Sequence, residues 1–367
     1  MAERQGTLEG MAVDRAFWRG RRVFLTGHTG FKGGWLALWL ADMGAEVHGY
    51  ALAPPTEPNL FSVTRLEERL ASHRLADVRD GAALLAAVQA ARPEIVLHLA
   101  AQPLVRYSYT APVETYAVNV MGTVNLLETL RQVDGVRTVV NVTSDKCYEN
   151  REWFWPYREN EPLGGFDPYS SSKACAELVS AAYRRSFLAA AGMGLASARA
   201  GNVIGGGDWA ADRLVPDFLR ALDAGETLVI RSPAAVRPWQ HVLEPLAGYL
   251  MLAERLHDSP GQYAGAWNFG PDEADARTVQ WIVERLCESV PGAGWKGTDE
   301  PQPHEAATLR LDSAKARSVL GWRPCWELAT ALDATLAWHR AWREGDDMAA
   351  FGLRQIAAYE LAGVGGA

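Results

Sequence analysis

The sequence predicts an α/β protein with a doubly wound parallel sheet and a smaller C-terminal α/β lobe. Three observations predict this fold class. Short apolar or β-branched runs alternate with helical stretches over residues 22–165, and a glycine-rich turn follows the first run. After about residue 200 the alternation breaks down, because glycines and prolines divide the chain into short segments. Such alternation is typical of a parallel sheet covered by helices on both faces.

The first strand–helix–strand unit lies at the beginning of this region. Residues 22–26 read RVFLT, a β-branched and apolar run that predicts a strand. Tryptophan and leucine recur through 33–43, which predicts a largely buried helix. Residues 45–50 predict the second strand.

The other elements of the sheet follow in the same alternating order. A short strand is expected just before Asp77, and a helix at about 80–91. Residues 94–99 form a continuous apolar run that is typical of a buried strand. Residues 119–130 predict a helix and 138–143 another strand.

The composition argues against several classes of function. The chain has 367 residues, a formal net charge of −8 and no Lys/Arg-rich run, so nucleic acid is not an expected partner. No apolar run approaches the roughly 18 residues that a membrane span needs. The four cysteines are scattered, which fits a reducing cytoplasm, and no group of His, Asp and Glu has metal-ligand spacing. We therefore expect a cytoplasmic protein without a metal and without a membrane partner.

The turn after the first strand has the features of a dinucleotide site. Gly27, Gly30 and Gly33 give the pattern GxxGxxG between a predicted strand and a predicted helix. Glycine permits a tight turn and a close approach of backbone to a pyrophosphate, and the helix N-terminus offers free N–H groups. The acid that would bind a ribose 2′-hydroxyl is missing, because none precedes Glu57 after the second strand. This rule therefore leaves the choice between NAD and NADP open.

A tyrosine and a lysine at helical spacing form a second candidate site. Tyr169 and Lys173 are four residues apart, so a helix places them on one face. An ammonium group there favours loss of the phenol proton. A phenolate is useful where a hydroxyl loses its proton as its carbon loses a hydride. The alternative interpretation is a half-buried aromatic side chain beside a solvated lysine.

Six stretches carry a resemblance that covers about residues 17–345. They read TGHTGFKGGWL (26–36), HLAAQPLVRYSY (98–109), NVTSDKCY (141–148), DPYSSSKACAE (167–177), RAGNVIGGGDWAADRLVPD (199–217) and RPWQHVLEPL (237–246). The first and fourth resemble the extended short-chain dehydrogenase/reductase superfamily. The third, fifth and sixth resemble, within it, the CDP-glucose 4,6-dehydratases. The resemblance implies a Rossmann domain that holds NAD and a smaller lobe that holds a nucleotide sugar.

The same resemblance suggests boundaries and cofactor contacts. The expected parts are an NAD-binding domain at 17–200 to which about 238–270 returns, a nucleotide-sugar lobe at 201–237 and 271–350, and peripheral tails at 1–16 and 351–367. The expected cofactor contacts are in the glycine turn, after two later strands and in the reactive pair, namely Gly27, Thr29, Gly30, Phe31, Lys32, Gly33, Asp77, Val78, Ala100, Ala101, Gln102, Tyr169 and Lys173.

The implied reaction is NAD-dependent loss of water across C5–C6 of CDP-glucose. Oxidation at C4 makes the C5 proton acidic, since the carbanion is then an enolate. Tyr169, assisted by Lys173, would take the O4 proton while the C4 hydride passes to NAD, and Ser144 would hold O4. Asp145 would protonate the leaving C6 hydroxyl, for which burial or a neighbouring carboxylate must raise its pKa. The alternative is that Asp145 is only a loop or cap residue.

Lys146 separates this chain from one group of relatives. The dTDP-glucose dehydratases have glutamate at the corresponding position, whereas the CDP-glucose group has lysine. Lys146 is either the C5 base or a cation that stabilises the enolate while another group moves the proton. The sequence does not distinguish these roles.

Arginines and one asparagine are the candidate contacts of the nucleotide sugar. Asn202 and Arg237 match diphosphate positions of the family, and the planar fork of arginine suits a diphosphate. Arg106, Arg213 and Arg310 are further candidates, against the alternative of ordinary solvated or ion-paired arginines.

Three alternative functions and one assembly remain to be considered. A dehydratase for another nucleotide sugar or a nucleotide-sugar 4-epimerase would share this fold, although Asp145 argues against epimerisation. A non-catalytic NAD-binding regulatory protein would be expected to lack the reactive tyrosine, the lysine or a glycine of the turn. By analogy with the superfamily, the helix that carries Tyr169 and the helix at about 115–130 would pair with a second copy in a homodimer or homotetramer.

Overall fold

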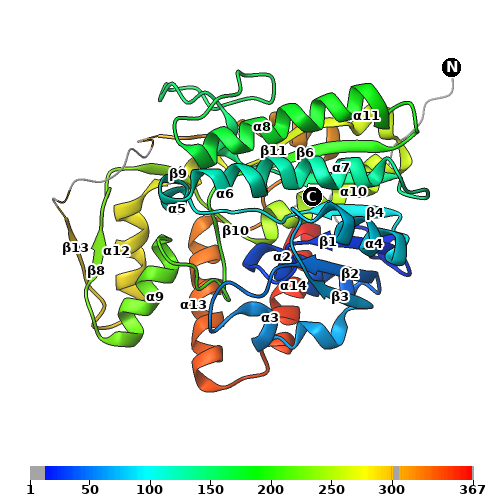
Figure 1. Ribbon diagram of the computed structural model, residues 1–367. Helices are drawn as coiled ribbons and strands as arrows, with labels where there is room; N and C mark the ends of the chain where they lie inside the picture. The colour runs from blue at the N-terminus through cyan, green and yellow to red at the C-terminus, as the bar shows by residue number, and fades with distance from the viewer. Residues whose placement is uncertain (1–12, 299, 301–305, 307, 366–367) are drawn as a thin grey trace, which may run out of the picture.

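The computed structural model describes residues 13–298, 300, 306 and 308–365. Its centre is a seven-stranded parallel sheet with the strand order β11-β6-β5-β4-β1-β2-β3 (Figure 1). The strands are β1 (Arg22–Thr26), β2 (Glu46–Ala51), β3 (Ser72–Leu75), β4 (Ile95–His98), β5 (Thr138–Val142), β6 (Gly194–Ala200) and β11 (Gly265–Phe269). The doubly wound α/β fold predicted from the sequence is confirmed.

Helices cover both faces of the sheet, and successive residues of β1 show how. Val23 and Leu25 pack into one core and Phe24 into the other, because side chains alternate along a strand. The first core lies under α2 (Phe31–Asp42), α10 (Leu243–Asp258) and α14 (Met348–Gly365). The second lies under α4 (Gly81–Ala91), α7 (Gly122–Leu130) and α8 (Pro168–Tyr183).

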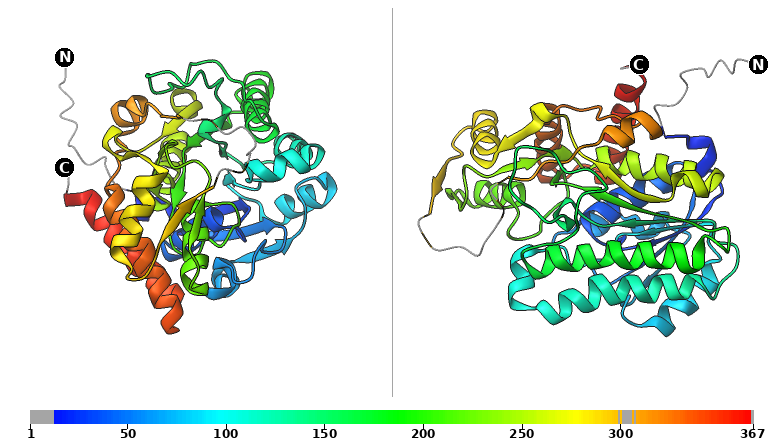
Figure 2. Two further views of the ribbon diagram at one scale, coloured as in Figure 1. Left: turned by 90° about the vertical axis from the view of Figure 1, so that its left-hand side faces the viewer. Right: turned by 90° about the horizontal axis from the view of Figure 1, so that it is seen from above.

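The helices of the second face begin early in the chain. The helix expected at 119–130 starts as α6 (Pro112–Tyr116) and continues through a π-helical turn, η2 (Ala117–Met121), into α7. It lies beside α8, as Figure 2 shows from above.

The smaller lobe has its own core. It contains α9 (Leu214–Ala224), α12 (Val279–Ser289), and the strand pairs β8–β13 and β9–β12, at Leu228–Ile230, Trp295–Gly297, Val236–Pro238 and Ala276–Thr278. Side chains of α13 (Leu328–Glu344) complete this core. The lobe stands to one side of the sheet in Figure 1.

The last helix is not a peripheral tail. α14 packs against α2, and its Ile356 and Tyr359 are buried. Apolar side chains recur on one face of this helix, so it seals the first core instead of trailing from it. Residues 1–12, also expected to be peripheral, lie outside the described residues.

Short elements connect these parts. They are α1 (Arg15–Trp18), α3 (Leu60–Val63), η1 (Leu66–Arg69), α5 (Val105–Thr110), η3 (Asp145–Cys147), η4 (Arg184–Leu188), β7 (Val203–Ile204), β10 (Gln240–His241), α11 (Pro260–Tyr263), η5 (Glu273–Asp275) and η6 (Ala316–Leu320). Within the part of the chain that the structure describes, no helix has the length and apolarity to cross a bilayer.

Candidate active site

A cleft of about 710 Å³ lies at the carboxyl ends of the strands, between the sheet and the smaller lobe. The strand order reverses between β1 and β4, and ligands of open α/β sheets bind at such a point. The residues predicted from the sequence line this cleft, except for two. Gln102 and Arg310 are not part of its wall.

The glycine turn has the close contacts that a dinucleotide site requires. Gly27 has a φ of +81°, and a Cβ on it would lie 2.8 Å from the Ala100 nitrogen. A Cβ on Gly33 would lie 2.1 Å from the Gly27 carbonyl oxygen, so only glycine lets α2 approach the turn. Helix α2 begins at Phe31, and no side chain caps its first N–H groups. The turn therefore leaves both space and donors for a pyrophosphate.

The cleft beyond the turn continues past the ends of β2 and β3. Leu52, Ala53 and Thr56 line it after β2, and no acid of the described chain stands among them. Asp77 also lines it, but hydrogen bonds from Arg79 hold its carboxylate and lower its pKa. Val78 is buried beside Gly122.

Helix α8 brings Tyr169 and Lys173 to the cleft. The helix begins at Pro168, and the Asp167 carboxylate caps it by accepting from the Ser170 N–H at 2.9 Å. Both reactive side chains are buried, and Lys173 Nζ donates to the Val142 carbonyl oxygen at 3.3 Å.

The charge states of this pair differ from the sequence expectation. Burial raises the pKa of Tyr169 to about 12, although a hydrogen bond with Ser144 acts in the opposite direction. Burial also lowers the pKa of Lys173 to about 8, against the attraction of Glu177. For both groups, removal from water outweighs these favourable interactions, so in the protein alone burial favours the neutral phenol and the neutral amine.

Ser144 and Asp145 follow directly from β5. The Ser144 hydroxyl donates to Asp145 Oδ1 at 3.0 Å and accepts from the Lys146 N–H at 3.1 Å. Asp145 is 2% exposed, and its Oδ2 has no hydrogen-bond partner. Burial raises its pKa, against the nearby charges of Lys146, Arg237 and Lys32. A buried carboxyl with a raised pKa and one free oxygen has the properties of a general acid.

Several cations surround this carboxyl. Lys32 is half-buried, and desolvation lowers its pKa to about 7, with Lys173 and Arg213 adding repulsion. Arg213 donates to the Asp208 carboxylate at 2.7 Å, and Arg237 is 3% exposed. The site thus concentrates positive charge, which suits an anionic substrate.

Two predicted residues have other partners. The Gln102 side chain donates to the Leu104 carbonyl oxygen and to Thr115, which turns it away from the cleft. Arg310 forms an ion pair with Glu273 at 3.2 Å. The backbone at these positions follows the expected path, but local hydrogen bonding decides where each side chain lies.

The structure also adds residues that the sequence analysis did not identify. Thr143, Asp208, Asp212, Arg231 and Trp239 line the cleft. Asp212 lies between Arg231 at 2.7 Å and Arg106 at 3.5 Å. Thr143 is the last residue of the strand predicted at 138–143, and this position at a strand end was a usable signal. Asp208 and Asp212, which pair with arginines, gave no such signal in the sequence. Their arginine partners are either distant in the sequence or of a kind that is common on protein surfaces.

Comparison with known proteins gives one family. A family model described as GDP-mannose 4,6 dehydratase matches residues 24–335. The CDP-glucose 4,6-dehydratase of Salmonella typhimurium (strain LT2) is 54% identical over 353 residues, which cover 95% of this chain and 98% of that protein. The solved structure of DesIV, a dTDP-glucose 4,6-dehydratase of Streptomyces venezuelae with NAD and TYD bound, has a TM-score of 0.75 and 25% identity, and the match covers 89% of this chain and 99% of that one. The chain therefore belongs to the GDP-mannose 4,6 dehydratase family.

Proposed function

We propose that the protein catalyses the NAD-dependent 4,6-dehydration of CDP-D-glucose to CDP-4-dehydro-6-deoxy-D-glucose. The observation that carries the proposal is the buried Asp145 carboxyl, whose free Oδ2 lies in the same cleft as Tyr169 and Lys173. An epimerase has no leaving group to protonate. The 54% identity to a CDP-glucose 4,6-dehydratase supports the choice of substrate.

The residues of the glycine turn fit the proposed cofactor. Gly27, Gly30 and Gly33 would approach its pyrophosphate, and Asp77 and Val78 would flank its adenine. Ala100 and Ala101 would line its path to the reactive pair. Bound NAD supplies an acceptor for the C4 hydride and later a donor for C6.

Tyr169, Lys173 and Ser144 would perform the first step. Tyr169, as the phenolate, would accept the O4 proton and become the phenol. Lys173 would stabilise the phenolate before this transfer, and Ser144 would hold O4 by a hydrogen bond. Since burial makes Tyr169 a weak acid in the protein alone, we infer that the minor fraction present as phenolate is the base that takes the O4 proton. A free phenolate need not accumulate.

Asp145 would then protonate the C6 hydroxyl as water leaves. Lys146 lies beside it in η3, and it serves either as the C5 base or as the cation that stabilises the enolate oxygen. After elimination, a hydride returns to C6 and a proton to C5. No external reductant is consumed.

Arginines and one asparagine of the cleft would bind the nucleotide diphosphate. Arg237 and Asn202 are the principal proposed contacts, with Arg213 and Arg106 nearby in the cleft. Arg310 is a weaker candidate because it is paired with Glu273. The boundaries proposed above, with 201–237 and 271–350 as the substrate lobe, stay a proposal.

A homo-oligomer in the cytoplasm is the proposed form of the protein. Apolar side chains are exposed on the paired helices of the second face, namely Val113, Met121, Leu178 and Phe187. Such a face suits a second copy of the same helices. Light scattering of the native protein and of Leu178→Glu tests this, with a smaller particle expected for the variant.

Mass spectrometry after incubation with NAD tests the reaction. CDP-glucose, dTDP-glucose, UDP-glucose and GDP-mannose are offered separately. Loss of one water from CDP-glucose alone supports the proposal. Dehydration of another sugar keeps the mechanism and changes the substrate, whereas an unchanged mass for all four contradicts dehydration and calls for chromatography of epimers.

A further inference from the structure

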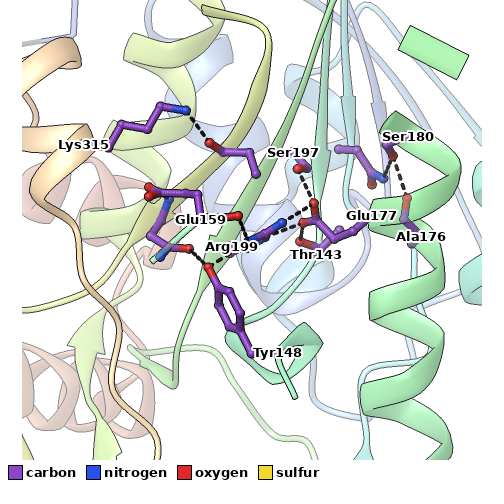
Figure 3. A network of polar contacts seen from close by, with 12 residues as sticks. Thr143, Tyr148, Glu159, Ala176, Glu177, Ser180, Ser197, Arg199 and Lys315 are labelled. Carbon is purple, nitrogen blue, oxygen red and sulfur yellow. Dashed lines mark hydrogen bonds and ion pairs between the residues drawn. The ribbon is translucent and has the colours of Figure 1, made fainter. Parts of the chain in front are cut away.

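A buried ion pair joins β6 to α8, the helix that carries the reactive side chains (Figure 3). Arg199 of β6 donates two hydrogen bonds to the Glu177 carboxylate of α8, from Nε to Oε1 at 2.9 Å and from Nη2 to Oε2 at 2.8 Å. The two side chains are 3% and 4% exposed. Although burial acts to raise it, the pKa of Glu177 is lowered, because Arg199, Ser197 and Thr143 stabilise the carboxylate.

The carboxylate also binds the strand that carries the proposed general acid. Thr143, the first residue after β5, donates its hydroxyl hydrogen to Glu177 Oε1 at 2.5 Å. Ser144 is the next residue, and Glu177 lies one helical turn beyond Lys173. Together with the bond from Lys173 Nζ to the Val142 carbonyl oxygen, this bond joins the Ser144–Asp145 segment to the helix that carries Tyr169 and Lys173.

The other side of Arg199 secures the segment that links these two parts. Its Nη1 donates to the Tyr148 hydroxyl at 2.8 Å and to the Glu159 carbonyl oxygen at 3.2 Å. The Tyr148 hydroxyl in turn donates to Asn268 on β11 at 2.7 Å. Neither Glu177 nor Arg199 lines the cleft, so the pair cannot touch a substrate there.

We propose that Glu177, fixed by Arg199, is a positioning residue that sets the distance between Ser144–Asp145 and Tyr169–Lys173 through its bond with Thr143. The inference rests on the proposed function, because it assigns those four residues to one reaction. Reacting groups must be held closely, and a displacement of 1 Å can reduce a rate by about a hundredfold.

Substitution of Thr143 tests the bond without breaking the ion pair. Thr143→Val removes the hydroxyl at nearly constant volume, and Thr143→Ser restores it. Ser180→Ala is the matched control, because Ser180 accepts a bond from Asn141 at 2.8 Å and so joins the same strand and helix farther from the cleft (Figure 3). These variants avoid Glu177→Gln, which would leave the Arg199 charge buried and unpaired and could prevent folding.

The expected results separate positioning from general stability. Thr143→Val should lower kcat for the nucleotide sugar by about tenfold or more, with KM within about twofold, because the hydroxyl that is lost bonds Glu177 behind the wall of the cleft. Thr143→Ser should regain most of the rate, and Ser180→Ala should stay near the native kcat at a similar loss of Tm. A native kcat for Thr143→Val, an equal loss for Ser180→Ala, or no recovery in Thr143→Ser would overturn the proposal.

Amide hydrogen exchange with NAD alone provides a readout that needs no substrate. Thr143→Val should speed exchange over residues 144–147, and Ser180→Ala should not. Equal exchange in the two variants contradicts the positioning role. If the native protein turns over none of the sugars offered, the proposed function fails, and this measurement still decides the role of the bond.

Discussion

At the scale of single residues, burial controls the charges in the cleft more than neighbouring groups do. The pKa of Tyr169 rises, that of Lys173 falls and that of Asp145 rises. In each case the largest cause is desolvation of the side chain by burial. All three shifts favour the neutral form of the group. Because burial raises the pKa of Asp145, this carboxyl more readily holds the proton that a leaving hydroxyl would need.

Replacement of the Asp145 carboxyl by an amide should separate oxidation at C4 from elimination of water. In Asp145→Asn, C4 oxidation depends on Tyr169 and Lys173 and should continue, but the leaving hydroxyl receives no proton. Dehydration should fall by roughly a hundredfold to ten-thousandfold. Stopped-flow absorbance should show reduced cofactor forming in the first turnover without the dehydrated product. Absence of this absorbance change would mean that Asp145 is needed before elimination.

Lys173 should set the alkaline limit of the reaction. Its pKa is about 8, so it loses its proton, and with it the support of the phenolate, as the pH rises through that value. The kcat of the native enzyme should therefore fall above about pH 8. In Lys173→Arg the charge persists, so a lower kcat should stay constant up to about pH 10. A fall at the same pH in this variant would assign the limit to another group, with Lys32 the first to examine.

At the scale of elements, the glycine turn and α2 form a unit that depends on one close contact. Gly33→Ala would bring a Cβ to 2.1 Å from the Gly27 carbonyl oxygen, so the helix must move away from the turn. We expect the Kd for NAD to rise by about tenfold or more, as the pyrophosphate loses its aligned donors. Titration calorimetry measures this.

Gly81→Ala is the control for that substitution. Gly81 also lies in the first turn of a helix, but its nearest neighbour to a Cβ is Asn125 at 3.9 Å. Its affinity for NAD should equal that of the native protein. Equal Kd values for Gly33→Ala and the native protein would show that the turn tolerates a displaced helix.

The sequence predicted those elements whose signals are local. Apolar runs in the sequence predict strands such as 22–26 and 138–143. Helical spacing predicts that Tyr169 and Lys173 share one face of a helix. The side chain of Gln102 and the guanidinium of Arg310 were harder to place, because Thr115 and Glu273 compete for them. The same holds for the Glu177–Arg199 pair, whose two members come from different elements and meet only in the folded protein.

At the scale of the whole molecule, one carboxyl joins distant parts of the chain. Glu244 of α10 accepts from the N–H groups of Cys325 and Trp326 and from the hydroxyl of Tyr359 on α14. It is fully buried, and burial raises its pKa to about 7, against these hydrogen bonds. Its charge therefore affects how the last helices attach to the core.

This predicts a dependence of stability on pH. The pKa of Glu244 in the folded protein lies above its usual value of 4.5, so its stabilising contribution is complete below about pH 4.5 and is lost as the pH rises through about 7. The loss is on the order of 3 kcal/mol. Glu244→Gln resembles the neutral acid and does not ionise. The Tm of this variant minus the Tm of the native protein should therefore increase as the pH rises from 5 to 8.

Differential scanning calorimetry at several pH values provides the comparison. The exposed Glu344 offers a control, since Glu344→Gln removes a carboxylate without removing a buried one. Its Tm should differ from that of the native protein by the same amount at every pH. Parallel pH curves for Glu244→Gln and the native protein would contradict the assignment.

The position of strand β11 in the sequence limits how a protein of this fold can evolve. It pairs with β6 at one end of the sheet, yet α9, β8 and β9 lie between these two strands in the sequence. A gene cut after residue 200 would leave β6 as an open edge, which invites aggregation. The smaller lobe is thus interleaved with the sheet in the sequence and cannot be exchanged as one contiguous segment. New sugar preferences must arise from point substitutions in the cleft and not from the shuffling of a terminal module.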